Sequence, residues 1–205
     1  MNYLAIDTSG KNLTILICKN DIVYSYFDGE CGVNHSVKVM PKVEELCIKY
    51  DFDLKDADFF CAVVGAGSFT GIRIGVSTIK AMCFAYNKPC LSITSFDTLA
   101  YNKDGGKVLA VIDAKHNGFY ACGYLDNKVN LLESYLMREE VLSLIDKYDK
   151  VVSSTLIDGI TSKIVPLDLG LEKAIESNLQ KIEQDISLLT PLYVRKSQAE
   201  EGRWI

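Results

Sequence analysis

Residues 59–75 read FFCAVVGAGSFTGIRIG, and the remaining elements can be placed outward from this stretch. Its apolar opening predicts a short buried strand, and a turn containing Gly65 and Gly67 then leads into a helix. Ser68 and Thr70 are candidates to cap the first helical turn, whose free amides could hold an anion. A turn that needs glycines only for its backbone explains these residues equally well, because their spacing matches neither the dinucleotide fingerprint nor the P-loop.

The chain on either side of this stretch predicts alternating strands and helices. Apolar residues three and four positions apart predict a helix over residues 36–50, and the helix after the glycine turn is expected to end near Asn87. Pro41 falls in the early turns of the first helix, where a missing N–H is tolerated. Strands are predicted at Tyr3–Ile6, Leu13–Cys18, Ile22–Phe27, Phe59–Val64 and Cys90–Ile93, a hairpin turn at 19–21 and a short helix at 95–101.

The second half of the chain repeats the order of elements found in the first half. After a polar segment at 102–107, residues 108–114 read VLAVIDA and echo the YLAIDT of residues 3–8. Each copy closes its first strand with an aspartate, Asp7 or Asp113. The repeat predicts an internal duplication. The second copy continues with strands at 119–125, 128–136 and 150–153 and helices at 138–148 and 171–185.

The composition is that of a globular protein without a strongly basic face. Hydrophobic residues make up 48% of the chain and charged residues 24%, with a formal net charge of −5 and no basic tract. A large basic surface that grips nucleic acid unaided is therefore not expected. The first residues lack the pattern of a signal peptide and no run approaches a membrane span, so the expected compartment is a reducing cytoplasm.

Cysteines and histidines give no metal-binding pattern. The seven cysteines contain no C-x-x-C pair, and only His35 and His116 could add imidazole ligands, so no metal site is expected. His35 precedes Ser36, a candidate N-cap of the first helix. A role of His35 as a general base competes with a purely structural role at the helix start.

Five short segments together resemble one known family. They are LAIDT at 4–8, HS at 35–36, GAGSFTGIRIG at 65–75, IDA at 112–114 and PLYVR at 191–195. The chain resembles the TsaB (YeaZ) family of the actin/Hsp70-like superfamily. Ala66 stands where that family usually has proline, and Lys115 where it commonly has arginine.

The resemblance implies an α/β fold made of two ribonuclease-H-like lobes from an internal duplication, the second lobe being degenerate. The N-terminal actin-like lobe would comprise residues 1–102 and carry the partner-binding helices. The C-terminal lobe would comprise residues 103–205, and its final segment could pack back on the first lobe.

The resemblance also implies an accessory role in making N6-threonylcarbamoyladenosine at position 37 of tRNAs that read ANN codons. The protein would have no catalytic residues or metal of its own. It would form a heterodimer with the transferase TsaD, support activity that depends on TsaE, and form a homodimer when isolated. tRNA would be contacted only within the complex, and ATP or ADP with Mg would be bound only at the level of the complex. Two alternatives stay open: an actin-like ATPase or phosphotransferase, and a glycoprotease-type metallopeptidase.

Two helices carry more apolar residues than one sheet-facing stripe requires. Burial within the core of the monomer explains these residues on their own, whereas the resemblance implies a helix pair that docks on the matching pair of TsaD or of a second copy. Gly71 and Gly75 would let another helix approach closely. The expected contact residues are Val39, Met40, Val43, Leu46, Cys47, Tyr50, Gly71, Ile72, Gly75, Val76, Ile79 and Cys83.

A second candidate site would contact a nucleotide or another anion. In the catalytic relatives of the superfamily, acidic residues at these strand ends help to hold a metal–nucleotide, whereas aspartates also commonly cap turns. Arginines could meet phosphate or form ion pairs. The candidate residues are Asp7, Gly65, Gly67, Ser68, Thr70, Arg73 and Asp113.

Overall fold

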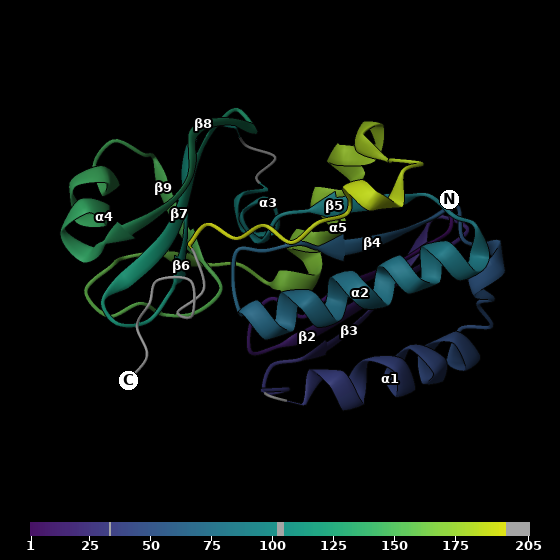
Figure 1. Ribbon diagram of the computed structural model, residues 1–205. Helices are drawn as coiled ribbons and strands as arrows, with labels where there is room; N and C mark the ends of the chain where they lie inside the picture. The colour runs from purple at the N-terminus through teal and green to yellow at the C-terminus, as the bar shows by residue number, and fades with distance from the viewer. Residues whose placement is uncertain (33, 102–104, 196–205) are drawn as a thin grey trace.

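The computed structural model describes residues 1–32, 34–101 and 105–195 of the 205-residue chain (Figure 1). The described strands are β1 (Tyr3–Asp7), β2 (Leu13–Lys19), β3 (Ile22–Asp28), β4 (Phe59–Val63), β5 (Cys90–Ile93), β6 (Lys107–Asp113), β7 (Gly118–Leu125), β8 (Lys128–Met137), β9 (Lys150–Ser153) and β10 (Lys163–Ile164). The helices are α1 (His35–Lys49), α2 (Phe69–Tyr86), α3 (Ser95–Ala100), α4 (Arg138–Ile145) and α5 (Leu167–Asn178), with 3₁₀ turns η1 (Leu54–Asp56), η2 (Leu179–Lys181) and η3 (Ile186–Leu188).

The strands form two five-stranded sheets of the same topology. The first sheet has the order β3-β2-β1-β4-β5, and the second, read from β8, has the matching order β8-β7-β6-β9-β10. In both sheets the first strand in sequence pairs antiparallel with the second and parallel with the fourth. This mixed topology confirms the predicted two-lobed α/β fold. The sequence pattern missed β10, because a strand of two residues shows no periodicity.

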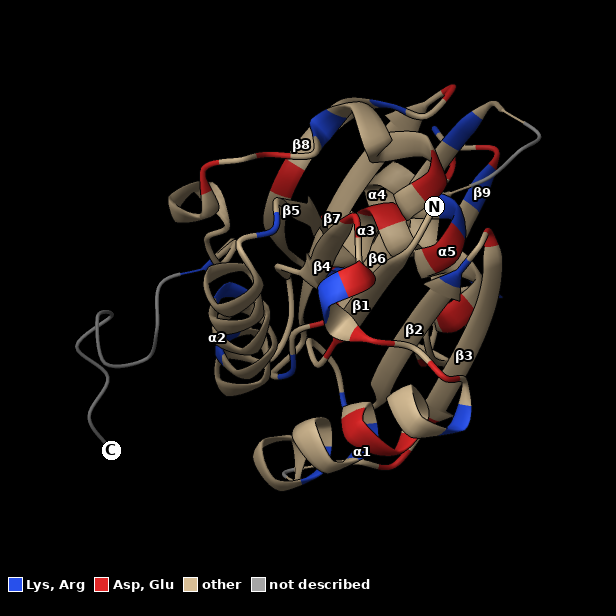
Figure 2. Cartoon of the chain, turned by 90° about the vertical axis from the view of Figure 1, so that its right-hand side faces the viewer, with Lys and Arg blue, Asp and Glu red and all other residues tan. Residues whose placement is uncertain are grey.

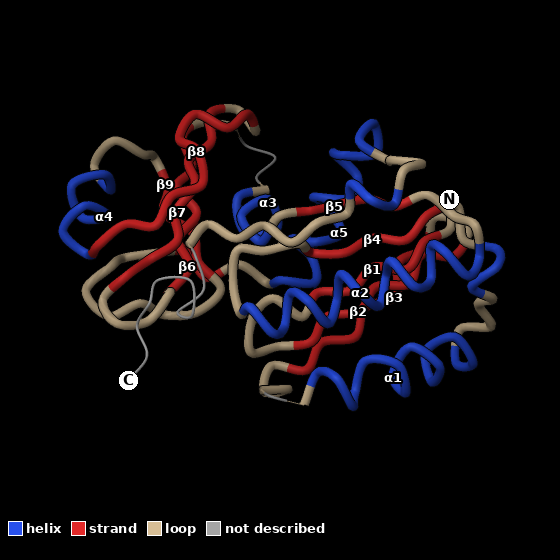
Figure 3. Tube along the Cα trace, in the orientation of Figure 1, coloured by secondary structure: helices blue, strands red, loops and turns tan. Residues whose placement is uncertain are grey.

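Helices cover both faces of the first sheet (Figure 3). α1 and α2 bury Val43 and Ile79 against Ile6 and the rest of one face. On the opposite face α5 buries Leu171, Ala174 and Ile175 against Tyr3 and Leu16. α5 lies in the second half of the sequence but packs on the first sheet. Each fully buried aliphatic side chain of such a layer contributes about 2 kcal/mol to folding.

α5 differs from its prediction in both of its ends. It begins at Leu167, directly after Pro166, and it ends at Asn178, whereas the pattern predicted a helix over residues 171–185. Beyond Asn178 the chain forms the 3₁₀ turn η2, whose Leu179 accounts for part of the apolar pattern that extended the predicted helix. η3 follows only after residue 185. The predicted lobe boundary between residues 102 and 103 lies outside the described residues.

The short helix α3 joins the two lobes. Phe96 and Leu99 of α3 pack in one cluster with Val108 and Ala110 of β6. Its Asp97 accepts a hydrogen bond of 3.0 Å from the buried hydroxyl of Tyr124 on β7. α4 covers the other face of the second sheet through Val141. None of the helices within the described ranges is both long and apolar enough to span a membrane.

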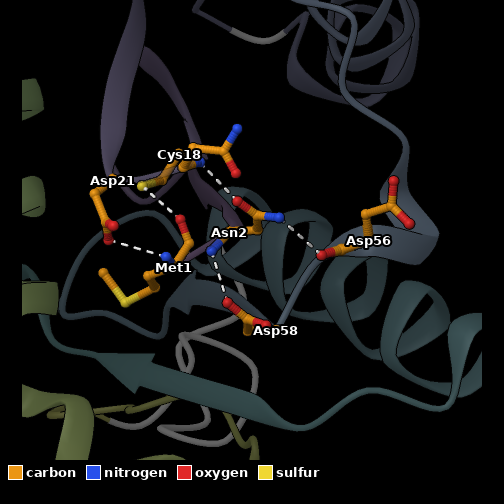
Figure 4. Close-up of polar contacts among 7 residues, drawn as sticks. Met1, Asn2, Cys18, Asp21, Asp56 and Asp58 are labelled. Carbon is orange, nitrogen blue, oxygen red and sulfur yellow. Dashed lines mark hydrogen bonds and ion pairs between the residues drawn. The ribbon is translucent and has the colours of Figure 1, made fainter.

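The first two residues fix the start of β1 to its surroundings (Figure 4). The amine of Met1 lies 2.9 Å from a carboxylate oxygen of Asp21, and the backbone N–H of Asn2 donates to Asp58 over 2.7 Å. The side-chain amide of Asn2 donates to the carbonyl of Asp56 over 3.2 Å. These contacts hold β1 in register between β2 and β4.

Candidate functional site

The glycine turn packs directly on the loop that follows β1. Gly65 and Gly67 have φ angles of 120° and 154°, in the region that favours glycine, and the peptide bond between Gly65 and Ala66 is cis. A Cβ on Gly67 would lie 2.2 Å from the carbonyl oxygen of Ser9, and the N–H of Ser68 donates to that oxygen over 2.7 Å. The glycines therefore serve a close contact between two backbone segments.

Only one of the two predicted caps forms at the start of α2. The hydroxyl oxygen of Ser68 accepts a hydrogen bond from the N–H of Gly71 over 3.2 Å, which confirms Ser68 as the N-cap. Thr70 lies inside the helix and is exposed, so its predicted capping role is wrong. At α1 the N-cap position is Asn34, and Ser36 lies one residue inside the helix.

A cleft of about 920 Å³ lies between the two lobes. Residues from the loop after β1, the glycine turn, the end of β6 and the start of α5 line it. Gly67, Ser68 and Asp113 of the predicted anion site meet here, whereas Thr70 and Arg73 do not line the cleft. Lys11 and Asn12 lie on the wall formed by the first lobe and were not predicted. Their only signal was their place directly after the strand that ends at Asp7.

Asp7 lies behind the cleft. Asp7 lines a small recess of about 40 Å³ together with Ser9 and Ser95, and the residue is 2% exposed. Ser9 also lines the cleft. The N–H of Ser9 donates to one carboxylate oxygen over 2.8 Å. Burial raises the pKa of the Asp7 carboxyl, although the Ser9 hydroxyl and N–H and the nearby His35 act in the opposite direction. Asp7 therefore lines the recess, whereas Asp113 lines the cleft.

Replacing Asp7 with asparagine is expected to make stability less dependent on pH. Because the folded pKa of Asp7 is raised, the folded protein keeps this proton where the unfolded chain has lost it, so stability falls as the pH rises through that range. The side-chain oxygen of an asparagine at this position could still accept the bond from Ser9. We expect Asp7→Asn to exceed the parent in free energy of unfolding at about pH 8, where the parent must bury a charged carboxylate.

Urea unfolding near pH 4 and near pH 8 measures this effect. The exposed Asp146→Asn serves as the matched control and is expected to change stability little at either pH. An Asp7→Asn protein less stable than the parent near pH 8 would contradict the interpretation that the buried charge is unfavourable.

Asp113 lies at the rim of the cleft and is held by Lys115. Its carboxylate accepts from the backbone N–H of Lys115 over 2.8 Å and forms an ion pair with the ammonium group of that residue. Partial burial acts to raise the pKa of Asp113, but these contacts and the more distant Lys11 outweigh burial and leave the pKa below its ordinary value. Asp113 is therefore a charged group already neutralised by its own loop.

His35 has a structural contact in the buried loop region. The residue is 4% exposed, and its Nε2 lies 2.9 Å from the carbonyl oxygen of Asn12. The side chain thus links the start of α1 to the loop after β1. Within the described ranges no group of three or more His, Cys, Asp or Glu side chains is placed to hold a metal ion.

Most of the predicted contact residues on α1 and α2 face the sheet of their own lobe. The buried members lie in the core cluster beneath the two helices, and Gly71 and Gly75 pack on Thr8, with distances of 2.1 Å and 2.6 Å from ideal Cβ positions to its oxygens. The buried residues are Val39, Val43, Leu46, Gly71, Ile72, Gly75, Val76, Ile79 and Cys83, whereas Met40 is exposed and Cys47 and Tyr50 are half-buried. The predicted contact of these residues with a partner stays a prediction.

The outer surfaces of the same helices still expose large apolar side chains. Val37 and Ile48 of α1 are 67% and 76% exposed, and Phe84 of α2 is 81% exposed. Figure 2, which colours charged residues, shows α2 almost entirely in tan. We call Val37, Met40, Ile48 and Phe84 the helix face. The helix face is therefore a candidate interaction site, because large apolar side chains that form a surface patch mark such sites.

The last described residues return across both lobes (Figure 1). We call residues 189–195 the strap. The N–H of Leu192 donates to the carbonyl of Val64 over 2.7 Å. Tyr193 accepts a hydrogen bond of 2.7 Å from Nε of Arg73 on α2, and Arg195 donates to the hydroxyl of Tyr135 on β8 over 3.1 Å. The strap thus contacts both lobes.

The duplicated mixed sheets and the cleft between them define a two-lobed α/β protein of the actin-like class. Over its whole length the chain is 30% identical to the "tRNA threonylcarbamoyladenosine biosynthesis protein TsaB" of Bacillus subtilis (strain 168), of which it covers 98%. The chain belongs to the TsaB (YeaZ) family, which confirms the resemblance seen in its motifs.

Further comparisons agree with this membership. The TsaD family, described as tRNA N6-adenosine threonylcarbamoyltransferase, matches residues 29–144. The TsaB protein of Escherichia coli (strain K12) is 28% identical over 128 residues, which are 60% of this chain and 55% of that protein. The structure of YeaZ from Pseudomonas aeruginosa superposes with a TM-score of 0.74 at 19% identity, covering 94% of this chain and 99% of the other, and thus shares its fold.

Proposed function

We propose that this protein is a non-catalytic subunit in the biosynthesis of N6-threonylcarbamoyladenosine at position 37 of tRNAs that read ANN codons. It would act in the cytoplasm by pairing with the transferase TsaD and would support activity that depends on TsaE. Isolated protein would form a homodimer through the same surface. The names of its relatives support the pathway, and the helix face supports the mode of action.

The helix face is the observation that carries this proposal. The TsaD family matches residues 29–144, and this range includes α1, α2 and therefore the whole helix face. A paralogue with the same pair of helices would offer a surface of the same shape. The helix face of one protein could then pack on the matching face of the other, as in an isologous dimer. Burying an exposed phenylalanine such as Phe84 at the centre of an interface is a strong source of affinity.

The cleft supports a scaffold more than an enzyme. Asp7 is almost fully buried with its charged form disfavoured, and Asp113 is neutralised by Lys115. A phosphotransferase would need carboxylates that share one metal–nucleotide. Neither the ATPase nor the metallopeptidase alternative gains support from these positions.

Reconstitution with purified components tests the proposal. We expect the chain alone to leave tRNA unmodified, and TsaD with TsaE to be nearly inactive on threonylcarbamoyl-adenylate and tRNA. Adding the chain should restore modification by at least tenfold, measured by mass spectrometry of nucleosides. Transferase activity from the chain alone, or full activity without it, would overturn the proposal.

A further inference from the structure

A small hollow lies beside the strap, separate from the large cleft. It has a volume of about 190 Å³, and Phe69, His116, Tyr120, Tyr193 and Arg195 contribute to its lining. Together with Arg73 we call these residues the arginine–tyrosine hollow. It contains residues of both lobes and three aromatic rings. None of these residues takes part in the helix face.

Arg73 is held in place at one edge of this hollow. Its guanidinium carbon lies 3.9 Å from the centre of the Phe69 ring, and its Nε donates to the hydroxyl of Tyr193. The rings of Phe69 and Tyr193 stack with centres 4.6 Å apart. These contacts fix an exposed arginine side chain that would otherwise sample many rotamers, which lowers the entropy cost when it binds a ligand.

Arg73 forms no ion pair with a described carboxylate. The ion pairs among the described residues use lysines or the N-terminal amine, and none involves this arginine. Among described side chains its Nη atoms have no hydrogen-bond acceptor. The guanidinium is thus a positive group on the surface of a protein whose formal net charge is −5.

A second guanidinium belongs to the other side of the hollow. Arg195 lies over the ring of Tyr135, 4.6 Å from its centre, and donates to the hydroxyl of that residue. His116, on the loop after β6, adds an exposed imidazole. Tyr193, which lines the hollow and contacts Arg73, is 40% exposed.

We propose that the arginine–tyrosine hollow binds a nucleotide unit of single-stranded RNA, with the arginines on phosphate groups and a base against the tyrosine rings. Planar guanidinium groups match phosphate oxygens, and aromatic rings accept an unstacked base of any sequence. An acidic peptide would use the arginines but leave the rings without a partner. The proposal rests on the proposed function, in which the RNA is the anticodon loop of tRNA.

RNA binding to charge-reversal variants tests this inference. The probe is a fluorescently labelled anticodon stem-loop RNA, and its affinity is measured by anisotropy with the chain alone and with the chain plus TsaD. We expect Arg73→Glu and Arg195→Glu each to weaken RNA binding by at least tenfold. The salt dependence should also become shallower, by about 0.7 in the log–log slope for each phosphate group that the variant no longer binds.

Lys128→Glu is the matched control. Lys128 is exposed at the start of β8, at the end of these strands opposite to Gly118, and its substitution by glutamate makes the same change of charge. The affinity of the Lys128→Glu variant for RNA should stay within about twofold of that of the parent. Tyr193→Phe keeps the ring but removes the hydroxyl that holds Arg73, so a smaller loss is expected. Thermal melting of each variant shows whether the protein is still folded after the substitution.

Three results would overturn the inference. The first is that both arginine variants bind the RNA as the Lys128→Glu control does, with and without TsaD. The second is that the parent protein binds no RNA in either setting at low salt. The third is that free AMP competes as well as the RNA, which would assign the hollow to a mononucleotide. Binding between the chain and TsaD is measured without RNA, so failure of the proposed function would be seen separately.

Discussion

The double variant Met40→Asp/Phe84→Asp is expected to lose association with TsaD by at least 100-fold while the chain stays folded. Both side chains belong to the helix face and are exposed in the monomer, at 49% for Met40 and 81% for Phe84. Their replacement therefore removes nothing from the core. At an interface, however, the change deletes an aromatic anchor and buries two carboxylates without partners, and a 100-fold loss corresponds to only about 2.7 kcal/mol.

Sedimentation of the isolated chain and titration calorimetry with TsaD measure this loss. The matched control is Leu132→Asp on β8, because Leu132 is 72% exposed and lies on the other lobe. We expect the control to retain the dimer and the affinity for TsaD, and the double variant to be a monomer. A double variant that still forms both assemblies would show that the helix face is not the docking surface.

Gly71→Ala is expected to destabilise the protein by at least about 3 kcal/mol, although alanine is the better helix former. In an exposed helix the change would add about 1 kcal/mol of stability. In α2, the new Cβ would lie 2.1 Å from the carbonyl oxygen of Thr8, which is a backbone atom of the loop after β1. The helix must move away from the sheet or the loop must shift, and overpacking of this kind costs more than helix propensity returns.

Gly32→Ala is a useful control for this experiment. Gly32 has a φ angle of 60°, so alanine there is strained, but the nearest atom to an added Cβ is 3.9 Å away. We expect it to cost about 1 kcal/mol, the usual penalty of a left-handed conformation. Urea unfolding followed by circular dichroism compares the two. A Gly71→Ala protein as stable as the parent would mean that α2 does not need its close approach to Thr8.

The sequence predicted the duplicated architecture well, because its signals are local and repeated. Hairpin residues such as Asn20 and Asp21 adopt positive φ, and each strand that was predicted as an apolar run is a strand in the structure. The glycine turn was also placed correctly between β4 and α2. The ends of α5 were less well predicted, because apolar residues in 3₁₀ turns extend a helical pattern without extending the helix.

The face of each helix that a partner could touch was harder to predict. The apolar residues at three- and four-residue spacing, such as Val43 and Ile79, identify the stripe that covers the lobe's own sheet. The helix face consists of apolar residues outside that stripe. In the sequence, only a large apolar side chain outside the stripe indicates this face, such as Phe84, which lies between Ala81 and Asn87. Periodicity alone does not say which of two apolar faces turns inward.

The structure brings the candidate anion site together only in part, and its role stays a prediction. Gly67, Ser68 and Asp113 meet at the cleft because strand ends and a helix start come together there. Asp7 sits at the equivalent place in the repeat but is almost fully buried, and Arg73 points toward the strap. Contacts of the strap join residues more than 100 positions apart, as for Arg73 and Tyr193, and no local pattern encodes such pairs.

The position of α5 has a consequence for the order of events during synthesis. Residues 167–178 leave the ribosome long after β1–β5, yet they supply the layer that covers one face of the first sheet. Until α5 has been synthesised, Tyr3, Leu16 and their neighbours are not covered by it. The nascent chain therefore exposes an aggregation-prone apolar surface for most of its translation. If the gene were split between the two halves of the repeat, the first half alone would leave that surface uncovered. The two halves therefore depend on being joined in one polypeptide.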